Sequence, residues 1–286
     1  MSKLIAFVDG SVYSESVCDH AAWIARGTGY SVELLHVLGR RDVSSAPSNL
    51  SGNITLGART ALLEELSSLD EQRAKLAQKY GRAILDDAKA RIESAGAGAG
   101  EVSAKLRIGD IVDTVAEFEV DAEIVVVGKR GEAADFAKLH LGSNLERIVR
   151  AGQKPVFVAS RGFRPIERFL IAYDGGASSM RAVDYVARGR LFAGLQCRLL
   201  TVGPDTAETR KRLDDARAIL EGAGHSVEAS IMQGQPETVI SHAVESEAID
   251  LLVMGAYGHS RVRSLIIGST TTGMVRSCKI PIALFR

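Results

Sequence analysis

The feature that most constrains this sequence is that its second half repeats its first. Later in the chain, residues 85–90 match residues 213–218 at a shift of 128 (213 minus 85). Near the N-terminus the shift is larger, 165 positions (174 minus 9), so the first half carries an insertion of 37 residues (165 minus 128). Duplication of one segment is the simplest explanation, and 286 residues suit two domains. The repeated pairs at the larger shift are Asp9 and Asp174, Ser14 and Ser179, and Val37 and Val202.

Each half alternates short apolar runs with longer helical segments, which predicts a parallel sheet covered by helices. The nearly continuous apolar character of several runs is typical of central strands that are buried on both faces. We therefore predict an α/β protein with two doubly wound, five-stranded parallel-sheet domains, at residues 1–160 and 165–286. In the second half the expected strands are 169–173, 196–202, 227–233, 250–254 and 282–285, and the expected helices are 179–192, 206–221, 237–247 and 269–276.

The insertion lies at about residues 40–80, between the second and third expected strands. Residues 40–53 are rich in Ser, Gly, Asn and Pro and read as a surface loop. The apolar spacing that follows predicts one long amphipathic helix or a helical hairpin. Two interpretations stay open: a longer second helix that lies on the sheet, or a lid or partner-docking face. The apolar residues are Leu62, Leu66, Leu69, Leu76, Tyr80, Ile84, Ala88 and Ile92.

Composition narrows the class of protein. The 35 Lys and Arg residues balance the 35 Asp and Glu residues, which argues against nucleic acid as the main partner. No apolar run approaches the roughly 18 residues of a membrane span, and no signal-type segment is present at the N-terminus. We therefore expect a cytoplasmic protein with no membrane partner. The three cysteines, Cys18, Cys197 and Cys278, have no metal-ligand spacing and read as buried apolar residues.

The strongest local signal is a glycine pattern in the second half that follows a buried strand and ends where a helix opens. Glycines let backbone N–H groups approach an anion, and a helix N-terminus adds unpaired donors and a positive dipole end. The carboxyl end of a parallel strand is also where open α/β sheets bind ligands. A purely structural alternative is a tight turn followed by a serine N-cap. The candidate phosphate-binding residues are Gly255, Gly258, His259, Arg261, Gly268, Ser269 and Thr270.

An Asp-Gly pair ends the first expected strand of each half. The carboxylates of Asp9 and Asp174 can accept hydrogen bonds from an adenine or ribose group, although an ordinary Asp-Gly turn explains the same residues. Val37 and Val202 end the second strands, where only their backbone groups could read a base edge.

These residues resemble the universal stress proteins, above all in the Gly-x2-Gly-x9-Gly-Ser pattern that begins at Gly255. The resemblance covers the whole chain, once per half, apart from the insertion. It implies the adenine-nucleotide α-hydrolase-like fold and ATP as ligand, with Mg²⁺ or Mn²⁺ beside the phosphates. Asp174 and Val202 would face adenine and ribose. The resemblance also implies that strands 156–159 and 282–285 pair across a pseudo-twofold axis, so that one chain imitates a dimer.

The first half departs from this pattern. Ten residues rather than nine separate Gly131 from Gly142, and Glu132 and Asp135 fall in this stretch, where carboxylates oppose a triphosphate. We therefore expect nucleotide mainly in the second domain. The weaker first-domain candidates are Asp9, Val37, Gly128, Gly131, Gly142 and Ser143.

The leading functional hypothesis is a stress-response or regulatory protein that binds ATP and need not turn it over. No P-loop, nucleophile elbow or His-Glu-x2-His motif is present in the sequence, and no residue is marked as a general base. One rival is slow ATP hydrolysis or adenylyl transfer at the same crevice. Another is a scaffold that binds a protein or apolar ligand through the insertion. Association into a homodimer stays open.

Overall fold

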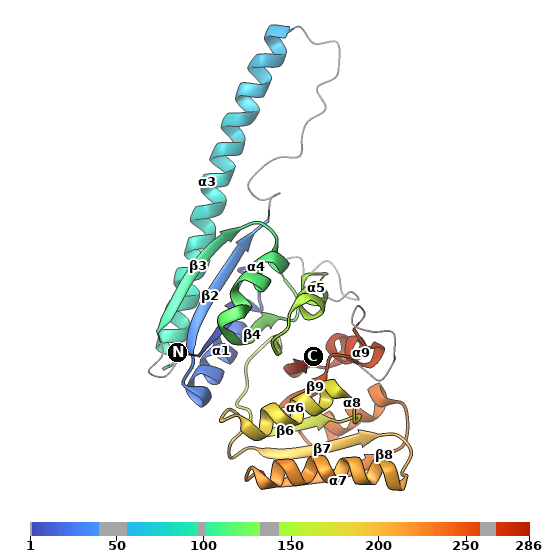
Figure 1. The fold of residues 1–286 in the computed structure, drawn as a ribbon. Coiled ribbons are helices and arrows are strands. Elements are labelled where there is room, and N and C mark those ends of the chain that lie inside the picture. Colours follow the sequence, from blue (N-terminus) through green and yellow to red (C-terminus); the bar gives the residue numbers. More distant parts are fainter. Residues whose placement is uncertain (1, 40–55, 97–100, 132–142, 258–266) are drawn as a thin grey trace.

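The computed structural model describes residues 2–39, 56–96, 101–131, 143–257 and 267–286. Strands and helices alternate along both halves, as predicted (Figure 1). The strands are β1 (Lys3–Phe7), β2 (Ser31–Leu38), β3 (Val102–Ile108), β4 (Ala122–Gly128), β5 (Val156–Ala159), β6 (Arg168–Ala172), β7 (Gln196–Val202), β8 (Val227–Met232), β9 (Leu251–Gly255) and β10 (Ile282–Phe285). The helices are α1 (Ser14–Thr28), α3 (Leu56–Ser94), α4 (Ile111–Phe118), α5 (Ser143–Ala151), α6 (Ala177–Arg188), α7 (Ala207–Gly222), α8 (Pro236–Ser246) and α9 (Ser269–Ser277), with a short 3-10 turn at Glu119–Asp121.

The two five-stranded halves form one continuous sheet. Its strand order is β3-β2-β1-β4-β5-β10-β9-β6-β7-β8, and every neighbouring pair is parallel except β5 and β10. The antiparallel register pairs Val158 with Ile282, Phe157 with Ala283, and Val156 with Leu284. Exchanging the halves maps this register onto itself, so a pseudo-twofold axis passes beside the Phe157–Ala283 pair. The pairing implied by the family resemblance is therefore present.

Helices cover both faces of this sheet, and the strands between them are buried on both sides. Leu4 and Ile5 of β1 point to opposite faces, and both are fully buried. One face packs against α1, the C-terminal part of α3, α6 and α7, and the other against α4, α5, α8 and α9. This double burial explains the continuous apolar runs in the sequence. No helix among the described residues is both long and apolar enough to cross a bilayer.

Most predicted boundaries agree with the structure within a few residues. The predictions for β7 and β10 match at both ends. The largest difference is α6, which was expected at 179–192 and spans Ala177–Arg188. The helix ends early because the backbone of Gly189, which follows it, is extended, with φ −88° and ψ 143°. Periodicity alone did not reveal this stop, since the apolar spacing continues to Phe192.

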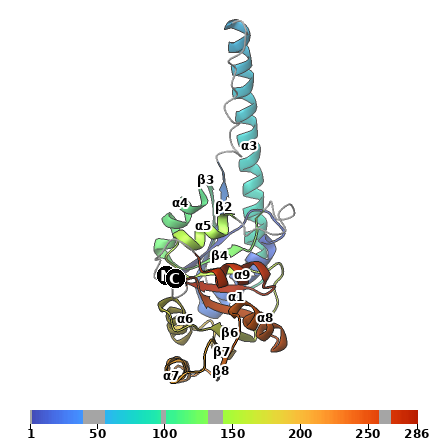
Figure 2. The same cartoon turned by 90° about the vertical axis from the view of Figure 1, so that its right-hand side faces the viewer.

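The described part of the insertion, residues 56–80, belongs to a single 39-residue helix, α3, and does not form a hairpin. The prediction that it lies on the sheet holds only for its C-terminal part, where Leu85, Ala88 and Ile92 are buried. The remainder projects far from the sheet (Figures 1 and 2). Leu69 and Leu76 in this projecting part are 54% and 68% exposed, so their apolar spacing does not mark a core face.

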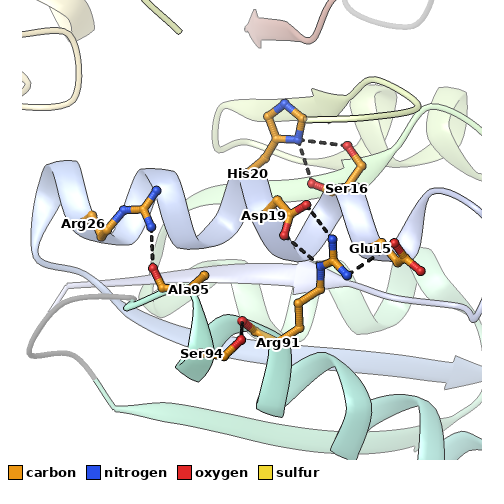
Figure 3. Close-up of polar contacts among 8 residues, drawn as sticks. All are labelled: Glu15, Ser16, Asp19, His20, Arg26, Arg91, Ser94 and Ala95. Atoms are coloured by element: carbon orange, nitrogen blue, oxygen red, sulfur yellow. Dashed lines mark hydrogen bonds and ion pairs between the residues drawn. The ribbon is translucent and has the colours of Figure 1, made fainter. Parts of the chain in front are cut away.

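Polar contacts fix the base of α3 to α1 (Figure 3). The Arg91 guanidinium donates to both carboxylate oxygens of Asp19, at 2.8 and 2.9 Å, and lies 3.3 Å from Glu15. Arg26 donates to the carbonyl of Ala95 just beyond the helix. A two-bond arginine–carboxylate pair sets orientation as well as distance, so the projecting helix has a defined direction relative to the body.

Candidate functional site

The second-half candidates lie at the rim where β9, β6 and β7 end side by side. Ala172 of β6 is in register with Leu200 of β7 and Met254 of β9. Asp174, Val202 and Gly255 therefore follow one another along the same rim. The chain runs from β6 to β7 on one side, while β9 lies on the other side of β6, so the rim between β6 and β9 is a topological switch point, which is where open α/β sheets bind ligands.

The Asp174 carboxylate is held by its own turn. Its Oδ1 accepts from Ser179 Oγ at 2.5 Å and from the Gly176 N–H at 2.9 Å. Gly175 between them has φ +75°, a conformation that favours glycine. The first half repeats the arrangement, because Asp9 Oδ1 accepts from the Ser11 N–H at 3.0 Å and from Ser14 Oγ at 3.1 Å. The turn explanation and the ligand explanation are compatible, since the turn orients the carboxylate.

Val202 contributes through its backbone. Leu200 O accepts from the Tyr173 N–H on the β6 side of β7. Backbone groups two residues apart in a strand point the same way, so those of Val202 also face the β6 side, beyond the last residue of β6. The Val202 side chain packs on the core instead. This orientation agrees with the sequence argument that only the backbone at this position could contact a base.

The start of α9 is tied directly to the tip of β9. The Gly268 N–H donates to Ala256 O at 3.1 Å, and Thr271 Oγ1 donates to Gly255 O at 3.0 Å. Gly268 is the N-cap residue and, as a glycine, has no side chain that could cap the helix, and the first turn holds no acidic residue. Ser269 is exposed and Thr270 is half-buried. The helix N-terminus therefore presents backbone donors and two hydroxyls at the rim beside β9.

Gly255 has a packing role that the sequence did not reveal. A Cβ at this position would lie 2.9 Å from Ser178 Cβ and 3.0 Å from Ser179 N. The start of α6 therefore packs against the bare backbone at the tip of β9. Gly128 shows the same relation in the first half, where a Cβ would lie 2.9 Å from Tyr13 Cβ. Close approach of helix and strand accounts for both glycines without a ligand.

Several predicted site residues are not placed. Gly258, His259, Arg261 and Gly142 lie outside the described residues. In the first half, Gly131 lies against Asp9, since a Cβ on Gly131 would be 2.8 Å from Asp9 Oδ2. Val37 is the last residue but one of the equivalent strand, β2, which ends at Leu38. Ser143 is the first residue of α5, whose first turn contains Glu146.

The two rims differ in residues that sequence reasoning missed. The Arg212 side chain lies over Gly175, with its Nη1 3.5 Å from the position of a Cβ there. In the first half, Ile84 and Tyr80 of α3 occupy the equivalent place over Gly10, at 2.8 and 3.3 Å from such a Cβ. The repeat shift of 128 (212 minus 84) aligns Arg212 with Ile84, so comparing the halves residue by residue would have found the difference. At this point one rim has an arginine, which also pairs with Glu208, and the other has the Ile84 side chain and the Tyr80 hydroxyl.

The residues after the first motif glycine connect the halves. Lys129, which follows Gly128, donates to the carbonyl of Cys278 at the end of α9. Burial lowers the pKa of Lys129 to about 8. In the other direction, Tyr257 Oη donates to Val149 O at 3.4 Å, and Arg286 Nη1 donates to Gly152 O at 2.9 Å at the end of α5. Cations and donors at helix C-termini are favourable, and here they come from the opposite half.

A family model described as the universal stress protein family matches residues 1–160 and again residues 165–286. The chain belongs to the universal stress protein family. Universal stress protein Slr1230 of Synechocystis sp. is 37% identical to it over 289 aligned residues, which cover 100% of both chains. A universal stress protein structure from Archaeoglobus fulgidus DSM 4304 has a TM-score of 0.75 at 19% identity and covers 99% of this chain and 98% of its own, which establishes the adenine-nucleotide α-hydrolase-like fold. Another, solved in complex with cAMP, is 24% identical and covers 43% of this chain with a TM-score of 0.38.

In this tandem universal stress protein, the described residues contain no group of three or more His, Cys, Asp and Glu side chains that could hold a metal ion. Mg²⁺ at nucleotide sites is typically bound by one or two protein oxygens together with phosphates and waters. The described rim, with one carboxylate at Asp174 and hydroxyls at Ser269 and Thr270, is compatible with that arrangement and not with an all-protein cage.

Proposed function

We propose that this universal stress protein binds ATP at the rim of its second half, and that its ATP-bound form acts in the regulation of a stress response. The start of α9 carries the proposal. Its N-cap residue, Gly268, has no side chain that could cap the helix, no acidic residue lies in its first turn, and its backbone is tied to the tip of β9. The positive end of a helix with uncapped N–H groups favours a phosphate group.

Each described element has a part in this binding mode. The Asp174 carboxylate and the Val202 backbone would contact adenine or ribose above β6. Ser269 and Thr270, with the first N–H groups of α9, would contact the phosphates. Arg212 would add positive charge at the Asp174 end of the crevice. The residues proposed to complete the phosphate loop are Gly255, Gly258, His259, Arg261 and Gly268.

A divalent cation, Mg²⁺ or Mn²⁺, would enter with the phosphates, where it neutralises their negative charge. The hydroxyls of Ser269 and Thr270 lie in the first turn of α9, and they would supply or orient the ligands of the cation. The remaining positions would be taken by phosphate oxygens and water.

The first-half rim supports nucleotide binding less well. Glu146 places a carboxylate in the first turn of α5, where it opposes an incoming phosphate and satisfies the helix dipole. The buried Tyr13 stands where the second half has Ser178, and Ile84 stands where it has Arg212. These substitutions replace polar or cationic groups with larger or apolar ones. We therefore propose that ATP binds mainly in the second half.

The contacts between the halves suggest how ATP binding would change the rest of the protein. Tyr257 lies two residues after Gly255 and contacts α5 of the other half. Lys129 contacts the end of α9, the helix whose start would bind phosphate. A ligand that shifts α9 or its preceding loop would therefore act on the interface between the halves. This arrangement favours regulation over turnover, with a cytoplasmic location as the working expectation.

Titration calorimetry with ATP and Mg²⁺ tests the proposal. Thr270→Glu puts a carboxylate at the start of α9, which suits the helix dipole but repels phosphate, so folding is preserved while ATP affinity falls by about tenfold or more. The matched first-half variant is Asn144→Glu, since Asn144 and Thr270 hold equivalent positions (Ser143 aligns with Ser269). It should leave the affinity unchanged. Adenosine, which has no phosphate, should bind Thr270→Glu and the unmodified protein alike.

The alternatives have distinct outcomes. Loss of affinity in Asn144→Glu but not in Thr270→Glu would place the nucleotide in the first half. Multiple turnovers of ATP that disappear in Thr270→Glu would identify a slow ATPase or adenylyl-transfer enzyme. No affinity for ATP or cAMP in the unmodified protein would favour the scaffold alternative.

A further inference from the structure

The projecting part of α3 carries an apolar seam, defined here as six residues spaced alternately by four and three positions. Five of the six are apolar. Leu62, Leu69, Leu76 and Tyr80 are 39%, 54%, 68% and 55% exposed, although they belong to one helix face. The seam residues are Leu62, Leu66, Leu69, Arg73, Leu76 and Tyr80.

This spacing is the pattern of a coiled coil, in which alternate steps of three and four keep one face toward a partner helix. Apart from Tyr80, whose hydroxyl lies over Gly10 of the body, the seam is separate from the face that packs on the body. The body face consists of Gly81, Leu85, Ala88 and Ile92, which are buried and, at 100° per residue, lie about 100° further round the helix than the seam. Most of the stability of a protein helix comes from packing an amphipathic face, and here the outer seam is exposed.

We propose that the seam binds the same seam of a second copy of this chain in an antiparallel coiled coil. The twofold axis would cross α3 near Glu71. In this register Leu62 packs against Tyr80 of the second copy, and Leu66 against Leu76. The third layer pairs Leu69 with Arg73, whose aliphatic stem can cover the leucine while its guanidinium reaches solvent.

Charge complementarity selects the antiparallel orientation. Residues that flank the seam on one side include Glu65 and Lys79, both exposed. In the antiparallel register Glu65 lies beside Lys79 of the second copy, and symmetry makes this contact twice. In a parallel, in-register pair Glu65 would instead lie beside Asp70 of the second copy, which is repulsive. The antiparallel register also brings the Asp70 residues of the two copies together near the axis, which is one repulsive contact against two attractive ones, so the flanking charges on balance favour the antiparallel orientation.

The geometry of the molecule is compatible with this arrangement. The N-terminal part of α3 stands clear of the body in both views (Figures 1 and 2). Antiparallel packing centred near Glu71 places the two bodies at opposite ends of the coiled coil. The contacts of Arg91 with Asp19 and Glu15 hold the base of α3 in a fixed direction (Figure 3). Because the helix is already held in place, its outer part loses little conformational entropy when it pairs with a second copy.

Sedimentation velocity over a range of concentrations tests whether the seam forms a dimer. The unmodified chain should dimerise, and Leu69→Glu with Leu76→Glu should be monomeric. The control is Ser67→Glu with Ser68→Glu, which adds the same charge at exposed positions facing away from the seam and should remain dimeric. Both leucines are mostly exposed, so the thermal unfolding of the monomeric variant reports whether its body is intact.

Charge reversal tests the orientation. Glu65→Lys and Lys79→Glu should each raise the dimer dissociation constant about tenfold, because each replaces two attractive contacts with repulsive ones, and the double variant should restore it. A tighter dimer in Glu65→Lys would refute the antiparallel orientation. The proposal would be overturned if the unmodified chain were monomeric, or if the dimer survived both leucine substitutions. The seam would then bind residues 40–55 of its own chain or another protein.

Discussion

Gly255 offers the sharpest test of whether a motif glycine serves packing or phosphate binding. In Gly255→Ala the added Cβ would lie 2.9 Å from Ser178 Cβ and 3.0 Å from Ser179 N. Both distances are shorter than ordinary van der Waals contact, and the second involves backbone, so the start of α6 must move. Overpacking of this kind typically costs about 1–3 kcal/mol. For a chain of this size we expect the melting temperature to fall by roughly 2–10 °C.

The measurement is thermal and urea unfolding of the nucleotide-free protein. The matched control is Gly222→Ala at the end of α7 in the same half, where a Cβ would meet nothing within 4 Å. It should be neutral or stabilise by about 0.5–1 kcal/mol, because alanine loses less backbone entropy than glycine. If Gly255→Ala were as stable as the unmodified protein without nucleotide and lost only ATP affinity, the packing argument would be wrong.

Three further predictions concern stability. Ile92→Ala removes a fully buried side chain where α3 meets the body and should cost about 2–5 kcal/mol in urea unfolding; a loss below 1 kcal/mol would mean that α3 is not part of the core. Burial raises the pKa of Glu33, but hydrogen bonds from Lys105 and Lys3 lower it further, so the net pKa lies below 4.5. The stabilisation by the Glu33 carboxylate is present above pH 4.5 and is lost as pH falls through the folded pKa. The Glu33→Gln variant should therefore unfold more easily at neutral pH, and its free energy of unfolding should fall less on acidification. The depressed pKa of Lys129 means that the unfolded chain binds more protons between about pH 8 and 10.5, so stability should rise across that window, and Lys129→Met should abolish the rise.

The repeat predicted most of the fold. Once Asp9 and Asp174 were aligned, each half had to contain the same strand and helix order, and the continuous apolar runs required strands buried on both faces. Boundaries were less certain, since the apolar spacing of α6 continues past its end at Arg188. The helical insertion was identified, but the direction of α3 was not. Leucine spacing shows that a helix has an apolar face without showing what covers it.

The candidate site was predicted only in part. Asp174 and the start of α9 were found because their residue types have strong local preferences in turns and at helix starts. Arg212, Tyr13 and Lys129 were missed because no local pattern marks them. Their positions depend on which helix packs over which strand end, and on which half reaches across to the other.

The sequence by itself determined the duplication, the alternating strands and helices, and the glycine and Asp-Gly turns, because all of these follow from local conformational preferences and from the burial period of each segment. The tertiary structure decided what those segments meet. It joined two five-stranded units into one sheet through β5 and β10, placed Arg212 at one rim and Ile84 at the other, and left the seam of α3 exposed. Such contacts link residues far apart in the chain, and their energies depend on relative positions that no local pattern specifies.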